Sequence, residues 1–573
     1  MKFIFRYLRP YLGRMAGGFS VKAAGTLIEL ALPFLLGLIL DECLDRGVGM
    51  IVACGMGMVV CAAVALICNV AANRMAASVA RDAAQRIRHD LFSSIMALSG
   101  SQTDRFTIPS LESRLTTDTY NIHHFIGVMQ RMGVRAPLLL GGGLVVTIII
   151  DPALSLVMIA LLPVIFGVVF LISKKGVPLY TRVQHSVDRM VRVVREDSQG
   201  IRVIKALSKV DHERERYDGV NRSLVRDEKR ASLTMGVVNP VMNLLMNLGI
   251  TFVVAVGASR VLGGQTEPGK IVTFTQYFSM ISMAMMSVTR LFVMYTKSAA
   301  SADRIKEVVD AEPDLVTHAE EDYPRKDGGA YIEFDRVSFS YNGKKDNLSD
   351  ISFRLKKGGT LGIIGATGSG KTTLVSLLMR FYDVGSGAIY IDGRDIRTIP
   401  DDELHTMFGV ALQNDFLYAD TVEENIKLGR ELSHEEVVKA AKTAQADGFI
   451  TAFPEGYDHL LSQKGTNVSG GQKQRLLIAR AVAGDPDILI LDDSSSALDY
   501  RTDAALRQAL AADMAGTTTI VVAQRVSSVK NSDLILVIDE GKIIGSGTHG
   551  ELMEGCTVYR EIAESQMGGA FVE

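Results

Sequence analysis

The chain has few cysteines, and its charges almost cancel. Cysteine accounts for 5 of the 573 residues, and Cys54, Cys61 and Cys68 recur every seven residues inside an apolar stretch. That spacing places the three on one helix face with no His or carboxylate among them, which predicts helix packing rather than a disulfide framework or a metal site. Lys and Arg number 61 against 64 Asp and Glu, so the net charge of -3 gives no support for a nucleic-acid partner.

The amino terminus lacks the small-residue cleavage site of a signal peptide. Basic residues alternate with aromatic and apolar ones over residues 1–14, and Pro10 interrupts the pattern. This predicts a short, broken amphipathic helix at the cytoplasmic surface of a membrane. A frayed soluble tail is the alternative.

Long apolar stretches fill the first half of the chain. The whole chain, at 573 residues, is too long for a single core of roughly 250 to 300 residues. A bilayer-spanning helix needs roughly 20 apolar residues, and six stretches meet that length. They predict an all-α, six-helix transmembrane domain over residues 15–310, with spans at about 15–40, 47–72, 132–150, 152–173, 235–259 and 271–294.

Charges inside and between these stretches add detail. Lys22 and Glu29 lie seven residues apart in the first span, on nearly the same helix face, and are expected to face the protein interior or a wet cavity. Asp151-Pro152 leaves room only for a tight hairpin between the third and fourth spans, which predicts antiparallel neighbours. Basic residues gather at the amino terminus and in residues 73–131, which places both termini in the cytoplasm of a multi-pass cell-membrane protein.

The charged stretches 73–131 and 174–234 keep apolar residues at helical spacing, which predicts long cytoplasmic extensions of the helices. Interruptions at 107–110 and 199–200 each leave two interpretations open. Short transverse helices could follow them, at Leu111 to Asn121 and Ile201 to Leu207, or each interruption could be an ordinary kink.

A Pro- and Gly-containing charged run over 311–330 predicts a linker, followed by an α/β domain over 331–573. There the strand Thr360 to Ile364 runs into a P-loop pattern. Its glycines let backbone N–H groups wrap phosphates, Lys371 would reach the β and γ phosphates, and Thr372 would ligate Mg²⁺. The predicted phosphate-binding residues are Gly365, Ala366, Thr367, Gly368, Ser369, Gly370, Lys371, Thr372 and Thr373.

A second strand, Ile488 to Leu491, is apolar throughout and ends in Asp492. Such a pattern is typical of a buried parallel strand that delivers a carboxylate to a metal-bound nucleotide. Together with the P-loop it predicts a nucleoside triphosphate site that uses Mg²⁺.

Between the P-loop and the Asp492 strand, residues 467–472 read Asn-Val-Ser-Gly-Gly-Gln, which resembles the signature of ATP-binding cassette proteins. Six spans ahead of one such cassette resemble a half-transporter of the exporter type, and the resemblance covers practically the whole chain. It implies a dimer in which each ATP lies between the P-loop of one chain and the signature of the other. The signature residues that would contact nucleotide are Ser469, Gly470, Gly471 and Gln472.

The resemblance also assigns roles to single residues. Tyr341 matches the aromatic residue that stacks on adenine, and Gln413 matches the glutamine that links Mg²⁺ to the membrane domain. The loop from Ser496 to Asp499 matches the one that crosses the dimer interface. For Tyr341, an ordinary alternating strand position remains the alternative.

Two residues depart from the family pattern in the expected catalytic position. Asp493 stands where the family usually has Glu, so the carboxylate is one methylene shorter and retracted from an in-line water. Gln524 stands where the family has a histidine, and an amide does not exchange a proton near neutral pH. The pair predicts a site that binds ATP well and hydrolyses it slowly, as in one subunit of a heterodimeric exporter whose competent site uses this chain's signature. A self-sufficient homodimer and a nucleotide-gated channel or sensor are the alternatives.

The fifth and sixth spans carry many methionines and a few hydrogen-bonding groups, which suggests a deformable surface for an amphiphilic or drug-like substrate. Packing of helix against helix is the alternative. The residues concerned are Met242, Asn243, Met246, Asn247, Gln276, Tyr277, Met280, Met283, Met285 and Met286.

Overall fold

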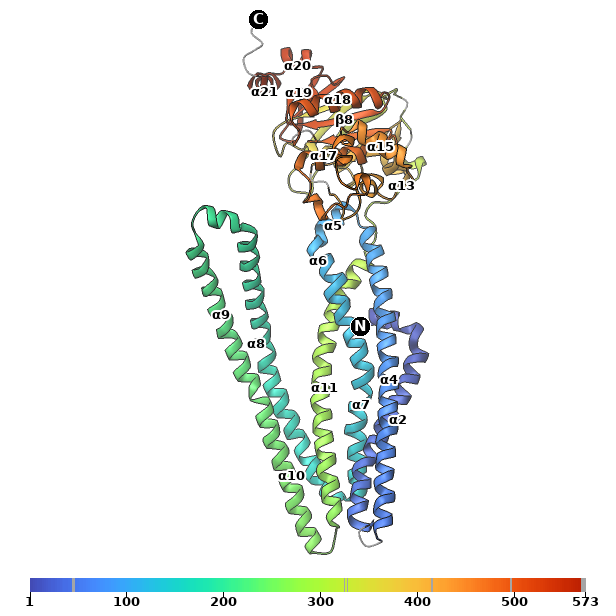
Figure 1. The fold of residues 1–573 in the computed structure, drawn as a ribbon, viewed down its shortest axis with the longest axis vertical. Helices are drawn as coiled ribbons and strands as arrows, with labels where there is room; N and C mark the ends of the chain where they lie inside the picture. The colour runs from blue at the N-terminus through green and yellow to red at the C-terminus, as the bar shows by residue number, and fades with distance from the viewer. Residues whose placement is uncertain (44–46, 324, 327, 414–415, 495–496, 568–573) are drawn as a thin grey trace. The chain divides into compact units, whose positions relative to one another are not determined.

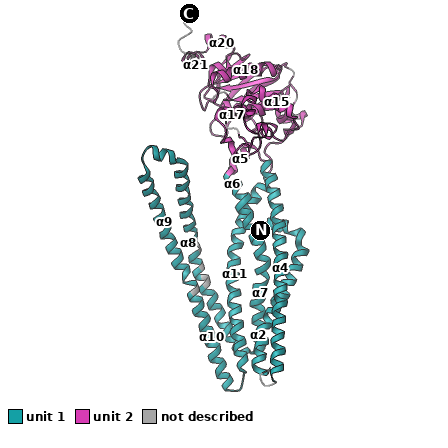
Figure 2. Cartoon of the chain, in the orientation of Figure 1, with its two compact units in different colours: residues 1–96, 109–311 teal, residues 97–108, 312–573 magenta. Residues whose placement is uncertain are grey.

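The chain forms two compact units. The structure, a computed structural model, describes residues 1–43, 47–323, 325–326, 328–413, 416–494 and 497–567. The helical unit comprises residues 1–96 and 109–311, and the α/β unit comprises residues 97–108 and 312–573 (Figure 2). An all-helical domain fused to an α/β domain is the fold class that the sequence predicts.

Long helices build the helical unit, and α2, α4, α7 and α11 pack against one another (Figure 1). Helix α4 has 49 residues, or about 74 Å at 1.5 Å per residue, more than twice the hydrocarbon thickness of a bilayer. The expected extensions beyond a membrane are therefore present. The elements are α1 Lys2–Leu8, η1 Arg9–Tyr11, α2 Leu12–Leu38, η2 Ile39–Cys43, α4 Val48–Met96, α6 Ile108–Ser113, η3 Arg114–Asp118, α7 Thr119–Ile150, α8 Pro152–Ala206, α9 Val210–Gly236, α10 Val238–Leu262 and α11 Pro268–Val309.

Five helical stretches among the described residues are long and apolar enough to cross a membrane, where the sequence predicts six. In α8 the described apolar stretch, Pro152–Val168, is shorter than the other five. The five are Lys2–Glu42, Val48–Met96, Ile108–Ile150, Val210–Leu262 and Pro268–Val309.

A one-residue turn joins α7 to α8. The Asp151 carboxylate caps α8 by accepting hydrogen bonds from the backbone N–H groups of Ala153 (2.9 Å) and Leu154 (3.2 Å). Near this turn the two helices pack antiparallel, as expected. Farther along, α8 leaves α7 and runs beside α10 and α9 (Figure 1), so the hairpin does not extend along the whole helices.

The α/β unit contains two sheets. One is antiparallel with the order β2-β1-β4-β5, and the other has the order β10-β9-β3-β8-β7-β6, in which the five strands from β9 to β6 are parallel and β10 is antiparallel at one edge. The strands are β1 Ile332–Phe339, β2 Leu348–Leu355, β3 Thr360–Ile364, β4 Ser386–Ile391, β5 Arg394–Asp395, β6 Phe408–Ala411, β7 Ile488–Asp492, β8 Thr518–Ala523, β9 Leu534–Asp539 and β10 Lys542–Gly547. The helices of eight or more residues are α12 Lys371–Leu378, α15 His434–Thr443, α17 Gly470–Val482, α18 Tyr500–Asp513 and α21 Thr557–Met567; the shorter ones are α5 Gly100–Phe106, α13 Asp401–Thr406, α14 Val422–Lys427, α16 Asp447–Ile450, α19 Val526–Val529 and α20 His549–Gly555.

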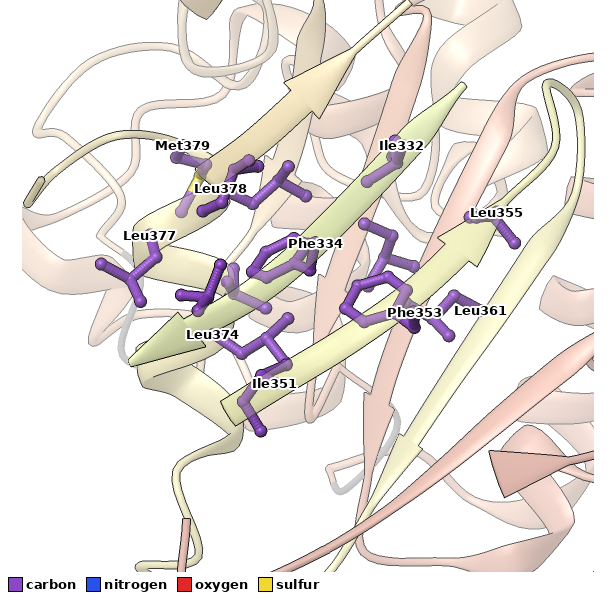
Figure 3. Close-up of a cluster of buried hydrophobic side chains, with 14 of the residues drawn as sticks. Ile332, Phe334, Ile351, Phe353, Leu355, Leu361, Leu374, Leu377, Leu378 and Met379 are labelled. Carbon is purple, nitrogen blue, oxygen red and sulfur yellow. The ribbon is translucent and has the colours of Figure 1, made fainter. Parts of the chain in front are cut away.

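A continuous apolar core holds the two sheets and α12 together (Figure 3). Phe334 on β1 and Phe353 on β2 stack with ring centroids 4.6 Å apart, and Leu374 and Leu378 of α12 belong to the same buried cluster. The P-loop connects β3 to α12, so burial of the apolar face of α12 fixes the position of the loop.

Helix α5 belongs to the α/β unit although it lies between two helices of the helical unit in the sequence. The Nε2 atom of Gln102 donates to the carbonyl oxygen of Glu312 (2.7 Å), and the Tyr382 hydroxyl donates to the Asp104 carboxylate (2.7 Å). One of the two open interpretations placed a short transverse helix at Leu111 to Asn121, where the chain forms α6, η3 and the start of α7.

At the second interruption, α8 runs unbroken through Gly200 to Ala206 and no separate helix forms among these described residues. The transverse-helix alternative therefore does not describe these residues. The chain reverses over Leu207 to Lys209, with Ser208 in the left-handed region at φ 54°.

Candidate nucleotide site

The carboxyl ends of neighbouring parallel strands bring the predicted site residues together. The P-loop follows β3, Gln524 follows β8, Asp492 and Asp493 end β7, and Gln413 follows β6. These four strands are consecutive in the sheet and parallel, so their carboxyl ends lie at one edge: Ile364 pairs with Ala523, Asp492 with Val522, and Ala411 with Leu491. They border one cavity of about 270 Å³, at the edge of the sheet where α/β proteins bind ligands.

Glycines make the P-loop geometry possible. Gly368 and Gly370 have φ values of 82° and 107°, in the region where a side chain is strained. A Cβ on Gly365 would lie 2.1 Å from the carbonyl oxygen of Ile538, so no larger residue fits without moving the loop. The backbone can therefore curl tightly enough to present its N–H groups to a phosphate chain.

Lys371, the first residue of α12, spans this curled loop. Its Nζ atom donates to the carbonyl oxygens of Gly365 and Ala366, both at 2.8 Å. Burial lowers the pKa of Lys371, although the carboxylates of Asp492 and Asp493 oppose that shift. The hydroxyl oxygen of Ser369 is buried and has no partner among the described residues, as expected of a donor available to a phosphate oxygen.

Thr372 and Asp492 form the part of the site suited to a divalent cation. The Thr372 hydroxyl donates to Oδ2 of Asp492 (3.2 Å), so both oxygens face the same point beside the P-loop. Burial raises the pKa of Asp492, and the Thr372 hydrogen bond lowers it. With the amide oxygen of Gln413 these are the hard oxygen ligands that Mg²⁺ prefers, and one carboxylate is enough where phosphate oxygens complete the shell.

Asp493 is held by two amides. Gln413 donates through Nε2 to Oδ2 of Asp493 (3.3 Å), and Gln524 donates to the same oxygen (3.1 Å). The backbone of Asp493 is in the left-handed region at φ 50°, and its N–H donates to the carbonyl oxygen of Val522 (2.8 Å). Non-glycine residues in this region are uncommon and gather at functional sites.

The environment of Asp493 favours the protonated form more than water does. Burial is the largest influence and raises its pKa; the charges of Lys371 and Arg525 and the Gln413 hydrogen bond oppose that rise. A carboxylate with a raised pKa can accept a proton, but here Oδ2 of Asp493 already accepts two hydrogen bonds. The general base available to an attacking water is thus the Asp493 carboxylate, which is one methylene shorter than that of Glu and is already hydrogen-bonded.

Tyr341 lies beside the amino-terminal end of α12, the helix that follows the P-loop. Its hydroxyl donates to Oγ1 of Thr373 (3.2 Å), and its ring meets Tyr382 edge-on at 5.1 Å and 88°. Phe339 packs edge-on at 4.8 Å. The Tyr341 side chain is about half exposed, which leaves area available for stacking on an adenine base.

The signature residues lie apart from this cavity. All four are described, and none of them borders it. Ser469 caps α17: its hydroxyl accepts from the N–H of Gln472 (3.3 Å), and its own N–H donates to the Gln472 side chain (2.9 Å). A Cβ on Gly470 would meet nothing within 4 Å, so the helix amino terminus is open to an anion from outside the chain.

Of the predicted interface loop, Ser496 lies outside the described residues. Asp499 caps α18, accepting from the backbone N–H of Thr502 (2.9 Å) and from its hydroxyl (2.8 Å). These hydrogen bonds lower the pKa of Asp499. Its side chain is thus fixed at the start of a helix rather than directed into the cavity.

Sequence reasoning missed Asn347 and Tyr382. Asn347 borders the cavity, and its Oδ1 accepts from the N–H of Tyr341 (3.1 Å). It stands in a polar loop before β2 with no motif around it, so only the fold reveals it. Tyr382 contacts both Tyr341 and α5, and the Ser99–Gln102 capping box was the one sequence signal for that helix.

Comparison with known proteins identifies the family. Residues 15–285 match the family model described as ABC transporter transmembrane region, and residues 348–496 match the one described as ABC transporter. An ABC transporter ATP-binding protein of Bacillus subtilis, YfiB, is 34% identical over 565 residues, which cover 98% of each chain. The chain belongs to the ABC transporter family.

Other comparisons agree with this assignment. An ABC transporter ATP-binding protein of Mycobacterium tuberculosis, Rv1273c, is 32% identical over 573 residues, covering 99% of this chain and 98% of that one. A solved structure of a bacterial Atm1-family ABC exporter with ATP bound shares the fold, with a TM-score of 0.80 and 24% identity over 99% of each chain. This ABC transporter is therefore a membrane protein whose α/β unit uses ATP.

Proposed function

We propose that this ABC transporter is one half of an exporter, that it pairs with a different chain, and that its own P-loop site holds ATP but hydrolyses it slowly. The observation that carries the proposal is the pair of amide hydrogen bonds on Asp493. Exporter-type architecture over the whole chain supports the direction of transport.

The chemistry follows from what each residue can do. Lys371, the P-loop N–H groups and Tyr341 would bind and orient ATP. Thr372, Asp492 and Gln413 would hold Mg²⁺, which would supply positive charge to the phosphate oxygens. Gln413 contacts Asp493 through Nε2, which leaves its amide oxygen for Mg²⁺, so binding does not require a free Asp493 carboxylate. Gln524 can donate to a phosphate oxygen but cannot take up a proton, so the step that needs a base is slow.

The signature argues for an unequal pair. Ser469 to Gln472 keep a capped, open helix amino terminus, which suits the γ-phosphate bound to another chain's P-loop. A partner with Glu and His at its own catalytic positions would then form one competent site with this signature. Hydrolysis there would reset a cycle that ATP binding drives by alternating access.

An exposed apolar tip on the helical unit supports a partner chain. Val203 and Leu207, at the turn between α8 and α9, are 61% and 64% exposed. Such residues in a polar hairpin are typical of a surface that another chain covers.

We also propose six spans, with residues 1–14 at the cytoplasmic interface and both termini and the α/β unit in the cytoplasm.

The substrate proposal is an amphiphilic molecule. Among the methionine-rich residues, Met242 and Met285 are buried and Tyr277 donates to the carbonyl oxygen of Leu30, so these serve packing. Met283 is 62% exposed and remains available to a ligand. The surface for cargo is therefore smaller than the sequence suggests.

The test measures ATP binding and ATP turnover by the chain purified alone in lipid. Tight binding of Mg-ATP with negligible turnover is expected, and turnover that rises when the correct partner is added. Brisk turnover alone would favour a self-sufficient homodimer. ATP-coupled uphill transport into inverted vesicles separates a pump from a nucleotide-gated channel, which would only let the substrate equilibrate.

A further inference from the structure

A pocket in the helical unit combines charges with an apolar lining at membrane depth. It lies between α2, α4 and α7, which pack side by side (Figure 1), and has a volume of about 410 Å³, within the range of ligand pockets. Its polar residues, Lys22, Glu29, Asn69, Asn73 and Arg135, lie in stretches otherwise apolar enough to span a membrane.

Hydrogen bonds link these residues in a chain. The Nζ atom of Lys22 donates to Oδ1 of Asn69 (2.6 Å) and to Oδ1 of Asn73 (3.4 Å). Asn69 in turn donates to Glu29 (2.8 Å), whose other carboxylate oxygen accepts a hydrogen bond from Nε of Arg135 (3.1 Å) and forms an ion pair with its Nη2 (3.1 Å). Glu29 is thus fully engaged by Arg135 and Asn69.

The pocket carries one positive charge more than its residues neutralise. Lys22 and Arg135 contribute two cations, and Glu29 contributes one anion. Among the described residues, none forms an ion pair with Lys22, which is only 5% exposed. A cation at membrane depth is costly, so such residues usually mark a ligand or ion path.

The apolar lining lies beyond this charge. Helices α2 and α4 are antiparallel, so Leu32 of α2 lies near Ala62 of α4, about 15 Å along the axes from Lys22. Ala62 and Ala65 are small and leave space where larger residues would fill the gap. The pocket is therefore polar at one end and apolar at the other.

We propose that this pocket binds an amphiphile with an anionic head group, a carboxylate or a phosphate, whose head pairs with Lys22 and whose tail lies along Leu32, Ala62, Ala65 and Leu66. The proposal deepens the proposed export function, on which it rests, because it names the class of cargo. Arg135, about half exposed, is the second cation within reach of the head group.

The chain has no tryptophan, so a single introduced one reports on the pocket alone. Leu66→Trp places it in the lining, and Val64→Trp is the matched control, at nearly the same depth and on the opposite face of α4. The probe is 9,10-dibromostearate, which quenches tryptophan on contact, added without nucleotide to the full chain in discs of zwitterionic lipid. Its methyl ester is the uncharged control.

Saturable quenching of Leu66→Trp by the acid is expected, with the ester and the Val64→Trp chain giving only the linear background of bilayer-dissolved probe. Lys22→Gln should weaken this binding by about tenfold to a hundredfold, since a hydrogen bond to a charged group is lost, while Lys22→Arg restores it. Arg14→Gln removes an exposed cation from the same helix outside the pocket and should change nothing.

Equal curves for acid and ester, or no effect of Lys22→Gln, would overturn the proposal. Should Leu66→Trp fail to fold, Leu32→Trp is the second reporter. Competition by phosphatidylglycerol in the discs would identify the occupant as a membrane lipid, and competition by dodecyl phosphate alone as a free amphiphile; inorganic phosphate should not compete. Because no ATP is present, loss of this binding beside intact ATP-coupled transport refutes the pocket and spares the export function.

Discussion

Lengthening one side chain and restoring a proton acceptor should turn the slow site into a fast one. Asp493→Glu adds one C–C bond of about 1.5 Å, and a 1 Å misplacement of a reacting group costs about 10²-fold. Gln524→His removes one of the two amides on this carboxylate and supplies a ring that can exchange a proton. Together the changes should raise kcat about 10²-fold, or about 2.7 kcal/mol of barrier.

The four chains of this cycle separate the contributions. Asp493→Glu alone should gain less than half of the free energy, because Gln524 still donates to the carboxylate, and the two changes should be more than additive. Steady-state Mg-ATP turnover in lipid measures all four. Lys371→Ala in the fast chain is the control and should abolish the gain. A doubly changed chain no faster than the native one would refute the link between this geometry and slow hydrolysis.

Three further outcomes are expected. Burial raises the pKa of Asp493, and the protonated acid cannot accept a proton, so residual turnover should fall as the pH is lowered. The fall should begin at a pH above the ordinary pKa range of Asp. A pH–rate profile without this loss at low pH would contradict the prediction. Gly365→Ala should weaken ATP binding at least tenfold, because its Cβ would lie 2.1 Å from a β9 carbonyl, whereas Gly448→Ala, with nothing within 4 Å, should not; equilibrium binding of a fluorescent ATP analogue compares them. Tyr382→Phe removes the hydrogen bond to α5, so amide hydrogen exchange in that helix should rise by up to about tenfold, and unchanged exchange would show that the bond holds nothing.

Local patterns predicted the parts of the site that are contiguous in the sequence. The P-loop glycines, Lys371 and the β7 strand with Asp492 could be placed because spacing and strand–helix context define them. The apolar parts of the long helices followed from apolar length, and their charged extensions followed from helical spacing.

The contacts among distant residues could not be predicted in this way. Gln413 and Gln524 meet at Asp493 because β6, β7 and β8 are neighbours in the sheet, and strand order is not written in any local pattern. The same holds for Asn347, which the fold carries to the cavity from the loop before β2.

Helix α5 shows a third limit. Gly100 to Phe106 is short and polar, so no apolar periodicity reveals this helix. The apolar pattern instead indicated a possible short helix at Leu111 to Asn121. Its place is fixed by close approach: a Cβ on Gly100 would lie 2.9 Å from the carbonyl oxygen of Phe381. Such fits depend on two surfaces at once.

The most direct test of the central claim is the fate of ATP bound to this chain purified alone. The chain carries both a P-loop and an intact signature, so a homodimer of it would lack only the usual base and switch residues. After the chain is loaded with γ-labelled Mg-ATP and free nucleotide is removed, we expect the bound nucleotide to remain ATP for many minutes. Rapid conversion of the bound nucleotide to ADP would contradict it and would show that Asp493 and Gln524 suffice for catalysis.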